Sequence, residues 1–325
     1  MSEAGQAVPE VAEARRRSRL AGFFIRLVRE KPLGTFGGAI VLVLLFAGIF
    51  ADLLAPYEMN EINLDALLAP SSGQNWLGTD QLGRDVLSRI IYGARVSVII
   101  GISATTINIV VATTIGVLSG FLGGKFDMVA QRFVDAWMAF PGLLLLITIM
   151  SLVGQGIIQI VLVLGILGGI GASRVVRSAV IGIKENTYFT AAEAIGSTTG
   201  RTLFRHVMPN IMSPIIIIFT TTVGGVILAE ASLSFLGFGL PPDVASWGGM
   251  LSGEGRKYMV ISPGLALWPG LALSVVVYGT NMFGDALRDL LDPRLRGGVG
   301  GLGNRGIELA GKAVRKREAK ARKIQ

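Results

Sequence analysis

Four long stretches of this sequence carry no charged residue, and they limit what the chain can fold into. They cover residues 96–124, 136–173, 207–229 and 258–284. Each is longer than the roughly 20 apolar residues that an α-helix needs to cross about 30 Å of hydrocarbon. Because 51% of the residues are hydrophobic and only 16% are charged, a water-soluble domain fits this chain poorly. The sequence therefore predicts an all-α integral membrane protein.

The 136–173 stretch is too long for one membrane-spanning helix, since a helix rises ~1.5 Å per residue and this stretch would extend about 57 Å. We expect it to fold back at residues 154–156, where the sequence Gly-Gln-Gly offers a turn. A further apolar segment lies at 33–54. We therefore predict six transmembrane helices, near residues 35–55, 95–119, 128–152, 157–174, 212–236 and 263–284.

The distribution of Lys and Arg predicts the orientation, because loops rich in these residues stay in the cytoplasm. Seven lie in the N-terminal tail, five between residues 174 and 210, and eleven in the C-terminal tail. The segments on the other side mix a few basic residues with acidic ones. Both termini and the 174–210 loop are therefore predicted to be cytoplasmic. The net charge of +8 then reflects topology or attraction to anionic lipid, and no nucleic-acid partner is expected.

These signals divide the chain into an ordered set of segments. A cytoplasmic tail over 1–34 precedes a first transmembrane helix over 35–56 and an extracytoplasmic segment over 57–93. A five-helix core follows over 94–285 and contains a cytoplasmic loop at 175–211. A basic cytoplasmic tail over 286–325 ends the chain.

The sequence offers little reaction chemistry. It contains no Cys, which removes thiol chemistry and thiolate metal sites. Its two Gly-Lys pairs precede Phe126 and Ala313, whereas a phosphate-binding loop requires Ser or Thr there. His206 is the single histidine, so it cannot belong to a histidine cluster, and it reads as an ordinary loop residue. We expect no catalytic residue, metal site or cofactor in this chain.

Three polar residues lie within or near the predicted spans, where such residues often mark function. Asp135 is expected to form a structural ion pair with Arg132, three residues before it. Glu230 could line a pore or hydrogen-bond between spans, or be protonated and merely buried. Asn281 is expected to cap the inner end of the last span. In the fourth span, Gly165 and Gly169 have the spacing that lets helices approach closely.

The segment that begins at Tyr188 is polar and basic, and it interrupts the apolar runs. Small residues would form a short helix that Gly196 ends, and a second helical stretch would run to Met208 before Pro209. Such a helix could dock on another protein or lie as a connector on the bilayer surface. The candidate docking residues are Tyr188, Thr190, Ala191, Ala192, Glu193, Gly196, His206 and Pro209.

This segment resembles the cytoplasmic signature loop of ATP-binding-cassette (ABC) importer permeases. The family pattern has two alanines, three residues, a glycine, twelve residues and a proline, and this chain matches it at Ala191, Ala192, Gly196 and Pro209. The family pattern opens on Glu and closes on Ile-x-Leu-Pro. This chain departs from it with Thr190 in place of Glu, His206 in place of Ile and Met208 in place of Leu.

A second resemblance concerns residues 76–89 (WLGTDQLGRDVLSR) and 93–97 (GARVS), which are similar to the start of the C-type permeases of dipeptide, oligopeptide and nickel importers. Further matching segments follow in order along the chain, so that the likeness covers residues 33–296. These segments are 139–142 (AFPG), 204–210 (FRHVMPN), 234–239 (SFLGFG), 246–250 (SWGGM) and 289–294 (DLLDPR).

The resemblance implies the type I importer permease fold in a bacterial or archaeal plasma membrane. It also implies that the chain forms half of a pathway with a homologous B-type permease. Two ABC ATPases would hold ATP and Mg²⁺ and receive the 175–211 coupling loop, and an extracytoplasmic binding protein would dock near Trp76 and Trp247. Peptides are the favoured solute, with nickel, glutathione or another small solute as alternatives. The rival from another class is a secondary transporter that uses Glu230 or Asp135 as a proton relay.

Overall fold

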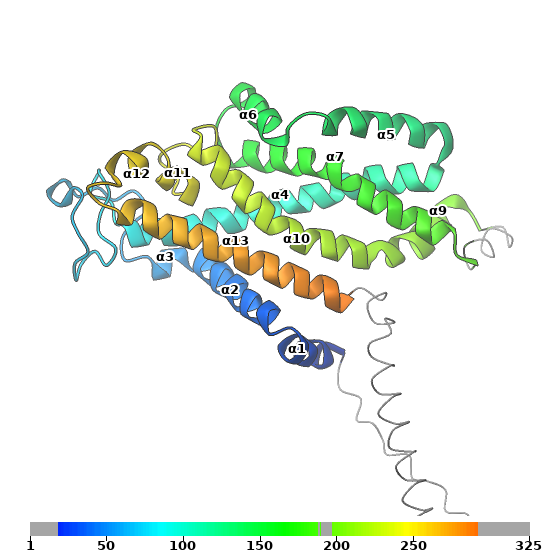
Figure 1. The fold of residues 1–325 in the computed structure, drawn as a ribbon, viewed down its shortest axis with the longest axis horizontal. Helices are drawn as coiled ribbons and strands as arrows, with labels where there is room; N and C mark the ends of the chain where they lie inside the picture. Colours follow the sequence, from blue (N-terminus) through cyan, green and yellow to red (C-terminus); the bar gives the residue numbers. More distant parts are fainter. Residues whose placement is uncertain (1–18, 188, 190–196, 292–325) are drawn as a thin grey trace, which may run out of the picture.

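The computed structural model describes residues 19–187, 189 and 197–291, and within these ranges the chain is helical with no β-strand (Figure 1). The elements are α1 (Arg19–Glu30), α2 (Pro32–Ile49), α3 (Ala51–Leu54), η1 (Leu64–Ala66), α4 (Val86–Leu122), α5 (Gly124–Met138), α6 (Gly142–Val153), α7 (Ile157–Lys184), α9 (Thr199–Thr202), η2 (Leu203–Val207), α10 (Met208–Phe235), α11 (Trp247–Leu251), α12 (Gly253–Tyr258) and α13 (Gly264–Leu291). The prediction of an all-α membrane protein is confirmed.

Five helical segments are long and apolar enough to cross a membrane, and a sixth span forms if α5 and α6 count as one bent segment. The span predicted over 128–152 is not one continuous helix, because α5 and α6 meet at an angle of 87°. The break falls at Pro141, which lacks a backbone N–H and disfavours the helical conformation in Phe140 before it. The fold-back predicted at 154–156 is confirmed, and Gly154 adopts a φ of 90° there.

Helix α4 extends well beyond its expected start at residue 95. It begins at Val86 and has 37 residues, which corresponds to about 56 Å and exceeds the thickness of the hydrocarbon core. The Asp85 side chain caps its first turn by accepting a hydrogen bond from the Ser88 backbone N–H at 2.8 Å. The 76–89 motif therefore contains a helix start.

The helix before Pro209 does not stop there as predicted. A π-helical turn at Leu203–Val207 leads directly into α10, and Pro209 occupies the first turn of α10. His206 consequently lies in the π-helical turn and is not the loop residue that we expected. Such turns are frequently found at functional positions in helices.

Helices α4 and α7 pack through glycines, which places their backbones in contact. A Cβ atom added to Gly165 would lie 2.9 Å from the carbonyl oxygen of Ala104, and one added to Gly169 would lie 2.7 Å from that of Asn108. The predicted packing role of both glycines is confirmed. Helices α2 and α13 meet in the same way, since a Cβ on Gly37 would lie 2.5 Å from the Gly279 carbonyl oxygen.

The long helices run side by side, and the shorter elements gather at the two ends of this bundle (Figure 1). Residues 55–85 and helices α3, α11 and α12 lie at one end, while α9 and the C-terminal end of α13 lie at the other. This separation matches the division between the predicted extracytoplasmic and cytoplasmic segments. The sidedness itself stays a prediction from the charge distribution.

Candidate functional site

A cavity of about 450 Å³ opens among α4, α7, α10 and the bend between α5 and α6. Its volume lies within the range of ligand pockets. Most of its wall is apolar, and the polar side chains in the wall are those of Asn108, Trp137 and Thr222. Asn108 lies near the middle of α4, and Thr222 lies near the middle of α10. The cavity therefore lies about halfway along the helices that cross the membrane.

Helix α5 is held against α7 by ion pairs near this cavity. Asp135 pairs with Arg174 of α7, and its predicted partner Arg132 lies 3.8 Å away. The structural pairing expected of Asp135 is present, although the closer partner comes from another helix. The Asp127–Arg177 pair, with Nε and Oδ1 separated by 2.6 Å, is less exposed and was missed in the sequence because its members lie 50 residues apart. Both pairs position the wall segment that α5 contributes.

Glu230 is only 1% exposed and does not line this cavity. Its carboxylate oxygen Oε1 accepts a hydrogen bond from the Ser234 hydroxyl at 2.7 Å, and that hydroxyl oxygen accepts one from the Leu240 backbone N–H at 3.2 Å. Glu230 therefore joins α10 to the turn that follows it. Of the alternatives left open by the sequence, the structure favours a buried hydrogen-bonded role over lining this cavity.

Asn281 is not the helix-end residue that the sequence predicted. Helix α13 continues to Leu291, and the Asn281 amide lies against α10, where a Cβ on Gly224 would be 2.7 Å from its Oδ1. The capping prediction is therefore wrong. Asn281 does not line the cavity, so the intramembrane polar residues chosen from the sequence are not gathered into one site.

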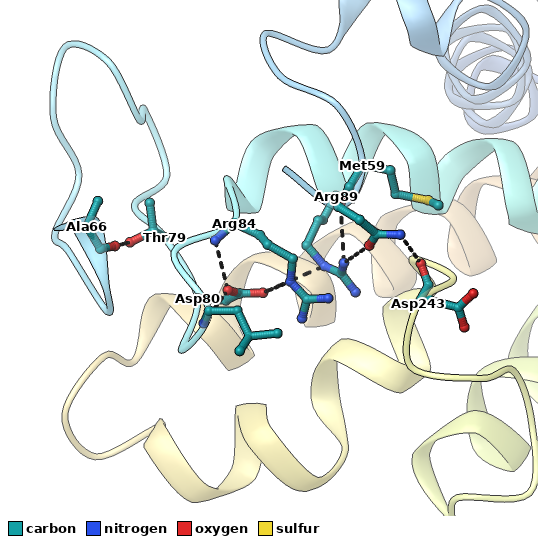
Figure 2. Close-up of polar contacts among 9 residues, drawn as sticks. Met59, Ala66, Thr79, Asp80, Arg84, Arg89 and Asp243 are labelled. Atoms are coloured by element: carbon teal, nitrogen blue, oxygen red, sulfur yellow. Dashed lines mark hydrogen bonds and ion pairs between the residues drawn. The ribbon is translucent and has the colours of Figure 1, made fainter. Parts of the chain in front are cut away.

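The 76–89 motif folds around the carboxylate of Asp80 (Figure 2). Its Oδ1 accepts hydrogen bonds from the backbone N–H groups of Leu82 and Arg84 at 2.9 and 3.0 Å. Its Oδ2 accepts one from Arg84 Nε at 2.7 Å, and Arg89 Nε lies 3.9 Å away. These contacts close a compact turn directly before α4.

Arg89 extends this network to two other segments at the same end of the molecule. Its Nη1 donates to Asn60 Oδ1 at 3.1 Å and to the Met59 carbonyl oxygen at 3.3 Å. Asn60 Nδ2 in turn donates to the Asp243 carbonyl oxygen at 2.8 Å (Figure 2). The network thus ties residues 55–85 to the start of α4 and to the loop after α10, forming a platform at this end of the molecule.

The two tryptophans chosen as binding-protein contacts differ in their surroundings. Trp76 is 69% exposed on the platform, as the prediction requires. Trp247 is only 2% exposed, and its Nε1 donates a hydrogen bond to the Ile90 carbonyl oxygen at 3.1 Å. The expected exposure of Trp247 is wrong, because the ring fills the space that Gly93 leaves free on α4. Trp247 is a packing residue.

Most of the predicted docking residues, Tyr188 and the positions from Thr190 to Gly196, lie outside the described residues. Their flanks are described. Phe189 is buried and packs edge-on against Phe121 with ring centroids 6.3 Å apart, an anchor that the sequence analysis missed. On the other flank, His206 is half-buried in the π-helical turn and Pro209 is exposed. The described residues on both sides of this segment thus pack within the helical bundle.

The membrane-length helices and the central apolar cavity define a multi-pass membrane permease. Residues 112–297 match the family described as the binding-protein-dependent transport system inner membrane component, and residues 18–70 match the N-terminal TM domain of oligopeptide transport permease C. This chain belongs to the binding-protein-dependent transport system inner membrane component family. It is accordingly an inner-membrane permease component of an ABC importer.

Curated relatives align along most of the chain. The glutathione transport system permease protein of Pectobacterium atrosepticum is 36% identical over 290 residues, which are 89% of this chain and 96% of the relative. The oligopeptide transport system permease protein of Bacillus subtilis is 37% identical over an alignment that covers 82% of this chain and 88% of the relative. The dipeptide transport system permease protein of Alkalihalophilus pseudofirmus is 37% identical over an alignment that covers 83% of this chain and 88% of the relative.

Proposed function

We propose that this permease forms half of the pathway of an ATP-driven importer for small peptides. The observation that carries this proposal is the shared chemistry of the solutes that name the relatives, since glutathione, oligopeptides and dipeptides all contain amide-linked amino acids. The mostly apolar cavity accords with an organic solute of variable side chains. Nickel, glutathione or another small solute is the alternative within the same family, and a proton-coupled secondary transporter is the less favoured one.

The proposed assembly contains a homologous B-type permease, two ABC ATPases and an extracytoplasmic binding protein. ATP and Mg²⁺ would bind to the ATPases. The segment containing Ala191, Ala192 and Gly196 would dock in an ATPase cleft, with Thr190 and Glu193 beside it. Closure of the ATPases would then shift the permease pair between inward-facing and outward-facing states, because ATP binds one state more tightly than the other.

The assembly is tested by purifying the tagged full-length chain from its native membrane in mild detergent. We expect a second permease and two ATPases to co-purify, and ATP to drive accumulation of a labelled tripeptide once the complex and its binding protein are in liposomes. Introducing Ala192→Arg with Gly196→Arg should remove the ATPases, because two bulky cations replace small side chains, while the second permease is retained. Purification of the chain alone, with solute uptake under a proton gradient, would contradict the proposal.

Glu230→Gln separates an ATP-driven importer from a proton-coupled transporter. Glutamine keeps the oxygen that accepts the hydrogen bond from Ser234, so we expect ATP-dependent uptake to stay within about twofold of wild type. Glu230→Leu removes that acceptor from a buried hydroxyl and should lower stability by about 1–3 kcal/mol. Uptake assays and thermal melts of both variants provide the measurement. Complete loss of uptake in Glu230→Gln would favour a proton relay at this position.

A further inference from the structure

We propose that Asn108 contacts the peptide groups of the solute as it passes through the cavity between α4, α7 and α10. The inference rests on the proposed peptide function and deepens it by assigning a residue that recognises backbone chemistry. It starts from one side chain in the wall of the cavity.

The Asn108 amide is buried without full hydrogen bonding. The residue is 3% exposed, and its Oδ1 accepts no hydrogen bond from the part of the chain that the structure describes. Buried polar groups in proteins are nearly always paired, because an unpaired acceptor in an apolar environment is costly. The Oδ1 atom is covered in this state of the protein, and because Asn108 lines the cavity, the atom becomes available to a donor on the solute when the helices move apart during transport.

Helix α7 leaves room for this amide at one glycine. The Nδ2 atom of Asn108 occupies the space beside Gly168 so closely that a Cβ atom there would overlap it. Gly168 also lines the cavity. The two helices thus hold the amide between them at the edge of the open space, where its orientation is restricted.

A carboxamide complements a peptide group, since each presents both an N–H donor and a C=O acceptor. Such a contact does not depend on the solute's side chains. The rest of the wall is largely apolar and includes Met138, Leu145 and Leu164, which suit side chains of varied shape. Asn108 would therefore recognise the backbone, while the apolar wall tolerates different peptides.

The test measures tripeptide uptake by the assembled transporter in liposomes at saturating peptide-loaded binding protein. Asn108→Leu removes both hydrogen-bonding groups at similar volume and should slow uptake about threefold to tenfold. Thr105→Val is the matched control, because Thr105 is fully buried in the same helix, its hydroxyl has no hydrogen-bond partner among the described residues, and it does not line the cavity. We expect this control to transport at the wild-type rate.

A second pair of variants keeps Asn108 and displaces it. Gly168→Ala places a methyl group against Nδ2 and should slow uptake as Asn108→Leu does. Gly270→Ala adds the same methyl group to α13, where the nearest atom, Leu251 Cδ2, lies 3.8 Å from the new Cβ, and it should leave uptake unchanged. Equal rates for Gly168→Ala and wild type would overturn the proposal, even if Asn108→Leu failed to fold.

A backbone-methylated tripeptide identifies the contact directly, because N-methylation removes the N–H that Oδ1 would accept. In wild type the methylated peptide should be imported more slowly, and the ratio of the two rates should move toward one in Asn108→Leu. Any preference of the binding protein for one of the two peptides affects the wild-type and Asn108→Leu transporters equally, so it cancels when their rate ratios are compared. An unchanged ratio, or loss of the second permease from the Asn108→Leu complex, would overturn the inference. Absence of any wild-type peptide uptake would overturn the proposed function and the inference with it.

Discussion

Replacing Gly116 with valine is expected to disrupt the contact between α4 and α7 and to destabilise the folded permease by about 3 kcal/mol or more. A Cβ atom at this position would lie 2.5 Å from the Ser173 carbonyl oxygen, 2.7 Å from Val176 Cβ and 2.9 Å from the Arg177 backbone nitrogen. Two of these three atoms belong to the backbone of α7, so a rotamer change cannot relieve the overlap. The helices would have to separate along their shared face.

The measurement is the melting temperature and the monodisperse fraction of the full complex in mild detergent. Gly270→Val serves as the control, because it introduces the same side chain on α13 at a position where the nearest atom to the new Cβ is Leu251 Cδ2 at 3.8 Å. We expect Gly270→Val to resemble wild type, while Gly116→Val yields little folded complex. Similar melting temperatures for the two variants would mean that α4 and α7 do not pack this closely.

The expected disruption at Gly116 would also reach the cavity. Asn108 and Gly168 face each other across the same pair of helices, and the Asp127–Arg177 pair joins α5 to α7. Since coupling between neighbouring contacts is common, separating α4 from α7 should alter the wall as well as the stability. Any Gly116→Val protein that folds is therefore expected to import peptide slowly.

Hydropathy was enough to predict the membrane class and the approximate position of most spans, and the Gly-Gln-Gly sequence added the turn at 154–156. It did not reveal the bend at Pro141, because residues 136–153 carry no charge on either side of the break. Hydropathy reports which solvent a segment prefers, whereas the direction of the backbone depends on local conformation. The Phe140-Pro141 pair was the available signal, since a residue before proline disfavours the helix.

The candidate sites were harder to predict, because they depend on which face of each helix is covered. Asn108 lies in a charge-free run that contains no other asparagine, which was a usable sign of a polar group at mid-membrane depth. Its unpaired acceptor could not be foreseen, since that depends on the position of Gly168 on another helix. For the same reason, motif matching identified residues 76–89 without revealing that Asp80 and Arg89 hold the platform together.

Trp247→Ala is expected to destabilise the permease by about 3–5 kcal/mol, which is the usual cost of deleting a buried tryptophan side chain. The ring packs against Gly93 and donates to the Ile90 carbonyl oxygen, so its removal leaves a cavity between α11 and α4. Thermal melting of the purified complex measures the effect. Gly93 and Trp247 complement each other in size. Gly93→Ala should therefore also lower the stability of the permease, because the added methyl group displaces the Trp247 ring.

Trp76→Ala provides the contrast, because this ring is 69% exposed on the platform. We expect its melting temperature to match that of wild type, since exposed substitutions usually change stability by less than about 0.5 kcal/mol. If the platform receives the binding protein, Trp76→Ala should instead weaken the stimulation of ATP hydrolysis by that protein. A Trp247 variant that melts normally but loses the stimulation would return Trp247 to the docking surface and contradict its burial. The two tryptophans thus distinguish a packing role from a contact role within one end of the molecule.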